Sequence, residues 1–151
     1  MLKKILRFFF IDYVLREDIA FLKKISLFRE LSDRSLAKLA LIIFKRNYLA
    51  GEKIYEINNE ANVLYLVKSG QIALSSGNTN KFVEKEGFFG EMSLLENTKH
   101  TFLATASKDS ELYLIYRAKF EDMTESNSKT GLIIIKNLAS MFAAKLKCSE
   151  V

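Results

Sequence analysis

The stretch Gly87-Phe88-Phe89-Gly90-Glu91-Met92-Ser93-Leu94-Leu95 decides the fold, together with the polar run that leads to His100 and the strand-like residues 101–105. Its glycines allow tight turns and a close approach of the backbone. Glu91 begins a short apolar turn of helix, where backbone amides attract anions. A carboxylate, these amides and a returning strand make a compact cradle that suits a phosphate and a sugar hydroxyl.

Apolar residues at helical spacing occupy both ends of the chain. They run from Leu2 to about Lys45, with a break over residues 26–33 in which Ser32 is placed to cap the following helix. Helical spacing returns after the central region and continues to Leu146. Two helical regions are therefore expected to flank a different central structure.

The central region, from Asn47 to Arg117, has short alternating segments separated by glycines and by asparagine-rich turns at 58–59 and 78–80. The alternation on either side of Gly70 predicts a hairpin that turns there. Regularly spaced short strands of this kind are typical of a small barrel or roll. The fold expected is mainly β: a β-roll or jelly roll (double-stranded β-helix) with N-terminal helices and a C-terminal helix.

The composition indicates one folded domain in a reducing compartment. The 151 residues are 49% apolar, which is enough to bury a single core. The net charge of +5 is spread among glutamates and gives weak support for nucleic-acid binding. The single cysteine, Cys148, cannot form an internal disulfide, and no apolar run approaches the roughly 20 residues of a membrane-spanning helix. We therefore expect a cytoplasmic protein.

Four segments in this order resemble the cyclic nucleotide-binding domain family, of the catabolite activator and protein kinase A regulatory subunit type. They are Leu27–Ser32, Ala50–Ile54, Leu64–Ile72 and Phe89–Leu95. The likeness extends from about Ile25 to Leu146. It implies an N-terminal helical extension over 1–24 and a cyclic nucleotide-binding-like domain over 25–151, within a single domain overall. Residues 89–101 are called the cassette below.

The resemblance implies cyclic AMP or cyclic GMP as the ligand. Glu91 would accept a hydrogen bond from the ribose 2′-hydroxyl, and the hydroxyl of Ser93 with the nearby amides would hold the phosphate. The ligand-binding residues implied in this way are Phe89, Gly90, Glu91, Met92, Ser93, Lys99, His100 and Thr101. The alternative is that Gly90 makes a tight turn and Glu91 caps a helix with no ligand present.

The cassette departs from the family at its phosphate-binding arginine, which lies nine or ten residues after the glutamate. Here those positions are His100 and Thr101, with Lys99 just before them. A neutral imidazole lacks the charged fork of arginine, and the missing contact is worth roughly 1.5–3 kcal/mol, about a ten- to hundredfold loss of affinity. The cassette is degenerate in this sense. Alternatively, His100 is an ordinary loop residue.

The function we expect is that of a stand-alone sensor or regulatory module in signalling. The alternative is a dimeric adaptor without ligand that docks a partner protein or a membrane surface through its terminal helices. Lys3, Lys4 and Arg7 beside the phenylalanines at 8–10 would suit a lipid surface. Regulators of transcription in this family carry a DNA-binding domain after the long last helix, and here Val151 ends the chain, so DNA binding is not expected.

The last helix is too apolar for one buried face. One stripe comprises Leu132, Ile135, Leu138 or Ala139, Phe142 and Leu146, and Ile133, Ile134 and Met141 widen it. The stripe and the residues that widen it could both be buried within the chain, one of the two faces on the barrel and the other under the N-terminal helices. The spacing of Ile134, Leu138 and Met141 instead suggests a helix pair between two subunits, and we predict a homodimer.

Neither catalysis nor a resident cofactor is expected. With one histidine and one cysteine, His100 and Cys148, the chain offers no nucleophile with a positioned base and no metal-ligand spacing. Haem would need ligands that these two residues alone do not supply.

Overall fold

The computed structural model describes residues 13–149. They form two compact units: residues 42–126 make the β unit, and residues 13–41 with 127–149 make the helical unit. The helical pattern predicted before residue 13 and the basic and aromatic side chains at 3–10 lie outside the described residues.

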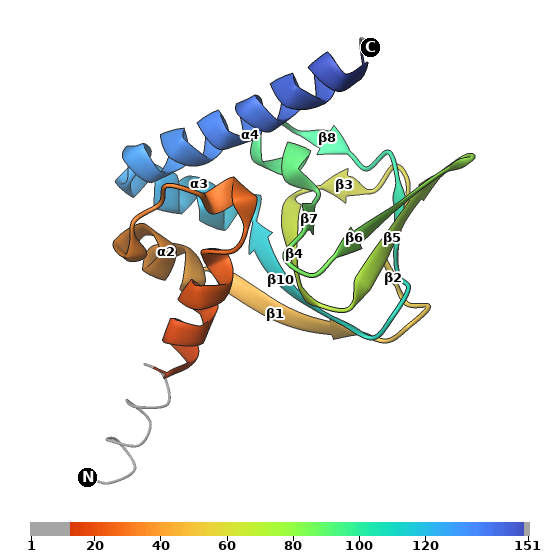
Figure 1. Cartoon of the computed structure of the whole chain (residues 1–151), viewed down its shortest axis with the longest axis horizontal. Coiled ribbons are helices and arrows are strands. Elements are labelled where there is room, and N and C mark those ends of the chain that lie inside the picture. Colours follow the sequence, from red (N-terminus) through yellow and green to blue (C-terminus); the bar gives the residue numbers. More distant parts are fainter. Residues whose placement is uncertain (1–12, 150–151) are drawn as a thin grey trace, which may run out of the picture. The chain divides into compact units, whose positions relative to one another are not determined.

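Ten short strands within residues 42–126 build the β unit, and all their pairings are antiparallel (Figure 1). The first sheet has the order β1-β10-β4-β7, which are Ile43–Tyr48, Ser110–Tyr116, Val63–Ser69 and Phe88–Phe89. The second has the order β2-β9-β5-β6, which are Lys53–Tyr55, Leu103–Ala106, Gln71–Ser76 and Thr79–Glu84. A third, two-stranded sheet joins β3 and β8, which are Glu60–Ala61 and Thr98–Lys99. The predicted roll of short strands is confirmed.

Side chains from both four-stranded sheets form one hydrophobic core. Alternate residues of β4, Val63, Tyr65 and Val67, belong to it, and Leu64 and Leu66 between them are buried as well. Because β4 is buried on both faces, its sequence is a continuous apolar run. The remaining core residues come from other strands: Tyr48, Tyr55, Ile72, Phe89, Ala104, Ala106, Leu112 and Leu114.

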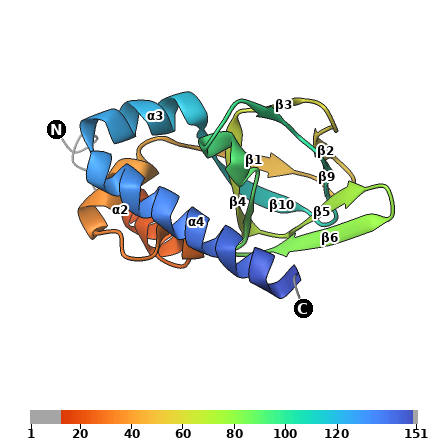
Figure 2. The same ribbon diagram turned by 90° about the horizontal axis from the view of Figure 1, so that it is seen from above.

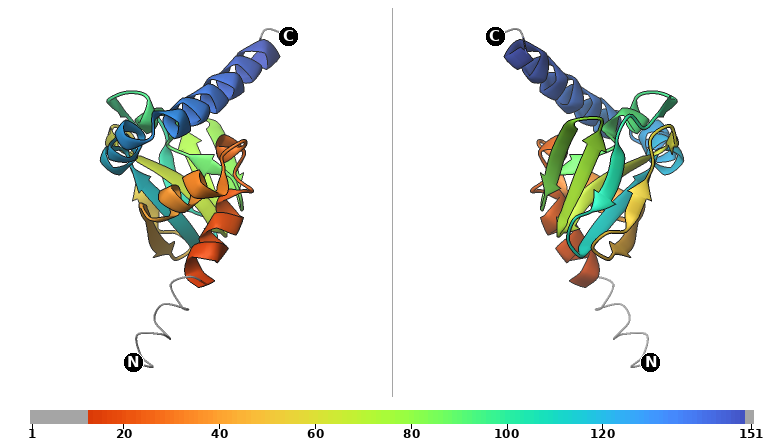
Figure 3. Two further views of the ribbon diagram at one scale, coloured as in Figure 1. Left: turned by 90° about the vertical axis from the view of Figure 1, so that its left-hand side faces the viewer. Right: turned by 90° about the vertical axis from the view of Figure 1, so that its right-hand side faces the viewer.

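The predicted hairpin at Gly70 is wrong. The strands on its two sides, β4 and β5, belong to different sheets, so the chain crosses from one sheet to the other there. Gly70 has a φ of +87°, and a Cβ at this position would lie 2.1 Å from the Ser110 Oγ. The hairpin is instead formed by β5 and β6, which lie side by side in Figures 2 and 3 and turn at Gly77 and Asn78.

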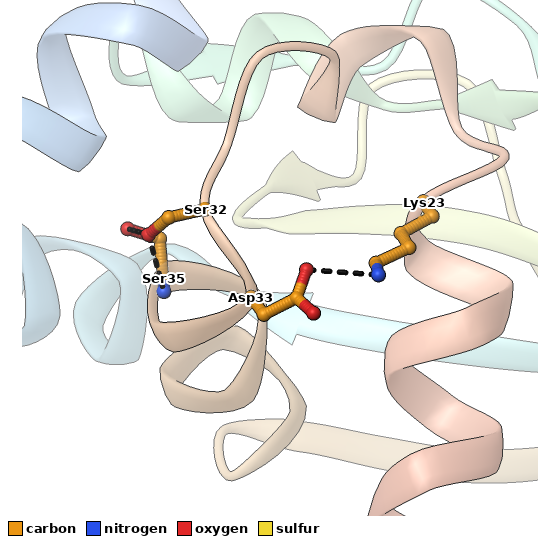
Figure 4. Close-up of polar contacts among 4 residues, drawn as sticks. All are labelled: Lys23, Ser32, Asp33 and Ser35. Atoms are coloured by element: carbon orange, nitrogen blue, oxygen red, sulfur yellow. Dashed lines mark hydrogen bonds and ion pairs between the residues drawn. The ribbon is translucent and has the colours of Figure 1, made fainter.

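The helical unit contains a helix over residues 13–22, the 3₁₀ helix η1 (Ser26–Phe28), α2 (Asp33–Ala40) and the long α4 (Ser128–Ser149). The predicted cap of α2 is confirmed, because the Ser32 Oγ accepts a hydrogen bond from the Ser35 amide at 3.2 Å (Figure 4). Lys23 forms an ion pair with Asp33 at 2.8 Å beside this cap (Figure 4).

The first helical region ends earlier than predicted. α2 ends at Ala40, and the strand β1 begins at Ile43, which the helical spacing had included. The pair Ile42-Ile43 favours an extended backbone because β-branched side chains pack well on a sheet. After β10 the chain continues into α3 (Arg117–Ser126) and then α4, so the predicted return to helix is confirmed.

α4 packs on η1 and is tied to it by one buried amide. The Asn137 Nδ2 donates hydrogen bonds to the backbone oxygens of Leu27 at 3.0 Å and Arg29 at 2.9 Å. Ile134 and Leu138 are 0% and 1% exposed. The seam predicted between two subunits at these two residues is therefore wrong, because their side chains are already covered within one chain.

No helix among residues 13–149 has the length and apolar character to cross a bilayer.

Candidate functional site

A left-handed glycine begins the cassette. β7 ends at Phe89, Gly90 has φ +75° and ψ +17°, and residues Glu91–Leu94 form the 3₁₀ helix η2. A Cβ on Gly90 would lie 2.6 Å from the backbone oxygen of Val63, closer than van der Waals contact allows. Both the dihedral angle and this close approach require glycine, so the cassette turn is fixed against β4.

The three residues after Gly90 differ in exposure. Glu91 is half-buried, Met92 is exposed and Ser93 is 0% exposed. The Ser93 Oγ has no hydrogen-bond partner among the described residues, although its amide donates to the Gly90 oxygen at 3.1 Å. A buried hydroxyl without a partner is costly and rare in folded proteins. The Ser93 hydroxyl therefore marks a place where a polar atom of a ligand or a water molecule would be accommodated.

The cassette then returns beside β3. In the register of β8 on β3, Lys99 lies opposite Glu60. The next residue, His100, exchanges two backbone hydrogen bonds of 2.9 Å with the Asn58-Asn59 turn. Asn58 has a φ of +69°, a left-handed conformation that asparagine adopts more readily than most residues. Lys99 and Thr101 are both exposed, whereas His100 between them is buried.

The imidazole of His100 is stacked on a tyrosine. Its ring lies 3.4 Å from the ring of Tyr55, centroid to centroid, with 7° between the planes. His100 is 8% exposed, and burial lowers its pKa below the ordinary value of 6.5. The side chain of His100 is therefore part of the interior and is uncharged at neutral pH, although the residue itself lies in the loop after β8.

Aromatic rings continue from this stack into the core. The ring of Tyr55 lies 5.6 Å from that of Tyr65 and 6.0 Å from that of Phe89, and the rings of Tyr65 and Phe89 are stacked at 4.8 Å. The pKa of Tyr55 is raised, mainly because the phenol is buried. The electrostatic effects of Tyr65 and of the Glu91 carboxylate raise it further. The His100–Tyr55 stack is therefore connected by ring contacts to Phe89, the residue before Gly90.

Tyr55 and Tyr65 were missed by sequence reasoning. Both occupy strand positions that the alternation marks as interior, but nothing in that pattern indicates that either side chain reaches the cassette. Of the eight predicted site residues, Phe89, Ser93 and His100 are buried, Gly90 and Glu91 are half-buried, and Met92, Lys99 and Thr101 are exposed.

Arg117 attaches the middle of the cassette to α3. Its guanidinium donates a hydrogen bond to the backbone oxygen of Glu96 at 2.9 Å, and its amide donates to the backbone oxygen of Asn62 at 2.9 Å. Arg117 is the first residue of α3. The cassette is thus held near its beginning by the close approach of Gly90 to β4 and in its middle by Arg117.

The arrangement offers hydrogen-bond donors and a carboxylate. Amides at the start of η2 and the Ser93 hydroxyl are suited to an anion, and Glu91 is suited to a hydroxyl. Within residues 13–149 no three histidine, cysteine, aspartate or glutamate side chains gather in a way that could hold a metal ion.

The family follows from comparison with known sequences. The model of the cyclic nucleotide-binding domain matches residues 45–127, more than half of the chain. The protein therefore belongs to the cyclic nucleotide-binding domain family, a family of regulatory domains, and the resemblance noted in the sequence is confirmed.

Individual relatives place the chain among larger proteins. It is 31% identical over 120 residues to the cyclic AMP receptor protein of Thermus thermophilus, covering 75% of this chain and 54% of that protein. It is 30% identical over 125 residues to glutaminase 2 of Bradyrhizobium diazoefficiens, covering 80% of this chain and 20% of that protein. The chain thus spans about half of one relative and about a fifth of the other.

The fold agrees with these matches. The crystal structure of the catabolite activator protein of Thermus thermophilus superimposes with a TM-score of 0.71 at 24% identity, over 83% of this chain and 60% of that chain. The predicted jelly-roll architecture with helices before and after it is confirmed.

Proposed function

We propose that this domain is a sensor or regulatory module whose cassette binds cyclic AMP or cyclic GMP weakly. The observation that carries the proposal is the unpartnered Ser93 hydroxyl, buried in a turn whose backbone requires glycine at position 90. A loop kept only as a tight turn would have no need of a buried polar atom, because an alanine would fill the same space without the cost of desolvation.

The weakness of binding is part of the proposal. His100 holds the position of the family's arginine and its ring is packed on Tyr55. A neutral imidazole supplies one donor at most, so affinity should be about ten- to hundredfold below that of a cassette with arginine. We take the role to be regulatory, because the matched family is one of regulatory domains.

A thermal-shift titration tests this function. Cyclic AMP or cyclic GMP at a hundredfold excess over Kd should stabilise the fold by about 2.7 kcal/mol, which is roughly 5–10 °C for a domain of this size. The linear nucleotide 5′-AMP is the control for unspecific effects. The variant Ser93→Ala should bind less well while keeping its fold. Absence of any shift at millimolar cyclic nucleotide, in both the natural protein and His100→Arg, would reject the proposal.

A dimeric adaptor that docks a partner protein is the second candidate, and the surface of α4 favours it. Leu132 and Leu146 are 69% and 67% exposed. Together with the exposed Ala139 they repeat at intervals of seven residues, and the half-buried Ile135 and Phe142 lie between them. An apolar repeat with this spacing is typical of helices that pair with each other. We propose this stripe, in place of the Ile134–Leu138 seam, as the surface of a homodimer.

Light scattering decides between monomer and dimer. The double variant Leu132→Glu/Leu146→Glu places charges on the stripe and should halve the mass of a dimer. Ser140→Glu, on an exposed position away from the stripe, is the matched control and should leave the mass unchanged. A natural protein that is monomeric at high concentration would remove the dimer from consideration.

A further inference from the structure

His100 is held in place by its backbone and by its ring. Its amide donates to the Asn59 oxygen and its oxygen accepts from the Asn58 amide, both at 2.9 Å. The ring is stacked on Tyr55 and buried. The imidazole is therefore positioned before any ligand arrives, against Tyr55, whose ring lies 6.0 Å from that of Phe89 at the start of the cassette.

No other side chain of the cassette is placed to supply a positive charge to this interior. Lys99 precedes His100 and is exposed while His100 is buried, as expected when consecutive residues of a strand point to opposite faces. An anion bound against Ser93 and the amides of η2 would therefore meet dipoles and one titratable ring. A nearby negative charge favours the protonated form of that ring.

We propose that His100 holds the anionic group of the ligand as an imidazolium, so that binding takes up one proton. This inference rests on the proposed function and adds to it a dependence on pH. Stacking on Tyr55 is compatible with both forms of the ring, because an imidazolium over an aromatic face gains a cation–π interaction. The other titratable groups on the elements near His100 are Tyr55 on β2, Glu60 on β3, Glu91 on η2 and Lys99 on β8. Glu56, in the loop after β2, forms an ion pair with Lys53.

The proposal has a quantitative consequence. Between the pKa of His100 in the free protein and its higher pKa in the complex, Kd should rise tenfold for each unit of pH. A cassette with arginine should bind without this dependence, because arginine stays charged throughout. The direction is unambiguous: affinity increases as the pH falls.

Titration calorimetry with cyclic AMP measures both the affinity and the proton. Cyclic AMP keeps a single negative charge from pH 5.5 to 7.5, so a change in Kd over this range reports on the protein. Two buffers of different ionisation enthalpy at each pH give the number of protons bound. The natural protein should bind more tightly at pH 6.5 than at 7.5, with tenfold as the upper limit of the change. His100→Arg should bind equally well at both, and His100→Gln weakly and equally at both.

Nuclear magnetic resonance provides a test that needs no variant. His100 is the one histidine in the sequence, so its ring C–H signals need no assignment by mutation. Their titration should give a pKa below 6.5 in the free protein and a higher one with saturating cyclic AMP.

The outcomes separate the two proposals. Binding with no change in Kd across this pH range, or a pKa of His100 that cyclic AMP leaves unchanged, would overturn the proton uptake and leave the proposed function standing. Binding by His100→Arg alone would also overturn it. If the folded natural protein and His100→Arg both fail to bind at every pH, the proposed function fails with it.

Discussion

Replacing Gly90 by alanine should destabilise the protein through two separable effects. The first is backbone strain, since a residue with a Cβ at φ +75° costs about 1–2 kcal/mol. The second is the 2.6 Å approach of that Cβ to the Val63 oxygen, which requires the cassette or β4 to shift and adds about 1–3 kcal/mol. The expected total is about 2–5 kcal/mol.

Gly51 is the matched control for this experiment. It has a φ of +89°, and a Cβ there would have no atom within 4 Å. Gly51→Ala should therefore show the strain alone, about 1–2 kcal/mol. The difference between the two variants isolates the contact with β4.

Urea unfolding followed by circular dichroism and tyrosine fluorescence measures both variants, since the chain has six tyrosines and no tryptophan. Agreement of the two signals would justify a single free energy of unfolding. If Gly90→Ala and Gly51→Ala differ by less than about 0.5 kcal/mol, which is within the scatter of ordinary surface substitutions, the fixed contact between cassette and β4 is refuted.

Three further predictions concern pH, a helix contact and a cap. Because burial lowers the pKa of His100, the unfolded chain binds the proton first, so the free energy of unfolding should fall as the pH drops below 6.5, by at most about 1.4 kcal/mol per unit. Urea midpoints from pH 7.5 to 5.5 should show a shallower fall for His100→Gln. Asn137→Ala leaves two backbone oxygens without their donor and should cost about 1–3 kcal/mol for each, whereas the exposed Ser140→Ala should be nearly neutral in the same assay. Ser32→Ala removes the cap of α2 and should lower the midpoint by an amount equivalent to about 0.5–2 kcal/mol; no change would show that the cap is dispensable.

Local features of the site could be predicted from the sequence because they depend on neighbours in the chain. The left-handed turn at Gly90, the helical turn from Glu91 and the cap at Ser32 each follow from one or two residue types. The stacking of His100 on Tyr55 could not be predicted this way. It depends on how the loop after β8 is placed against β2, which belongs to another sheet, and the period of a strand gives only the face on which a side chain lies.

The error at Gly70 has the same origin. A strand, a glycine and a second strand describe equally well a hairpin and a corner between two sheets. Only the register shows that β4 pairs with β10 and β7 while β5 pairs with β6 and β9. At Ile43, by contrast, two signals competed locally: helical spacing continued, but the β-branched pair began a strand.

The double attachment of Arg117 restricts how the cassette can move. Any displacement of Glu96 must either break its 2.9 Å bond to the guanidinium or draw the first turn of α3 along with it. The amide of Arg117 also donates to the Asn62 oxygen, so the first turn of α3 is held beside the residue that precedes β4. A shift of the cassette is consequently carried through one guanidinium to the start of α3, so the loop and this helix are mechanically coupled within the β unit.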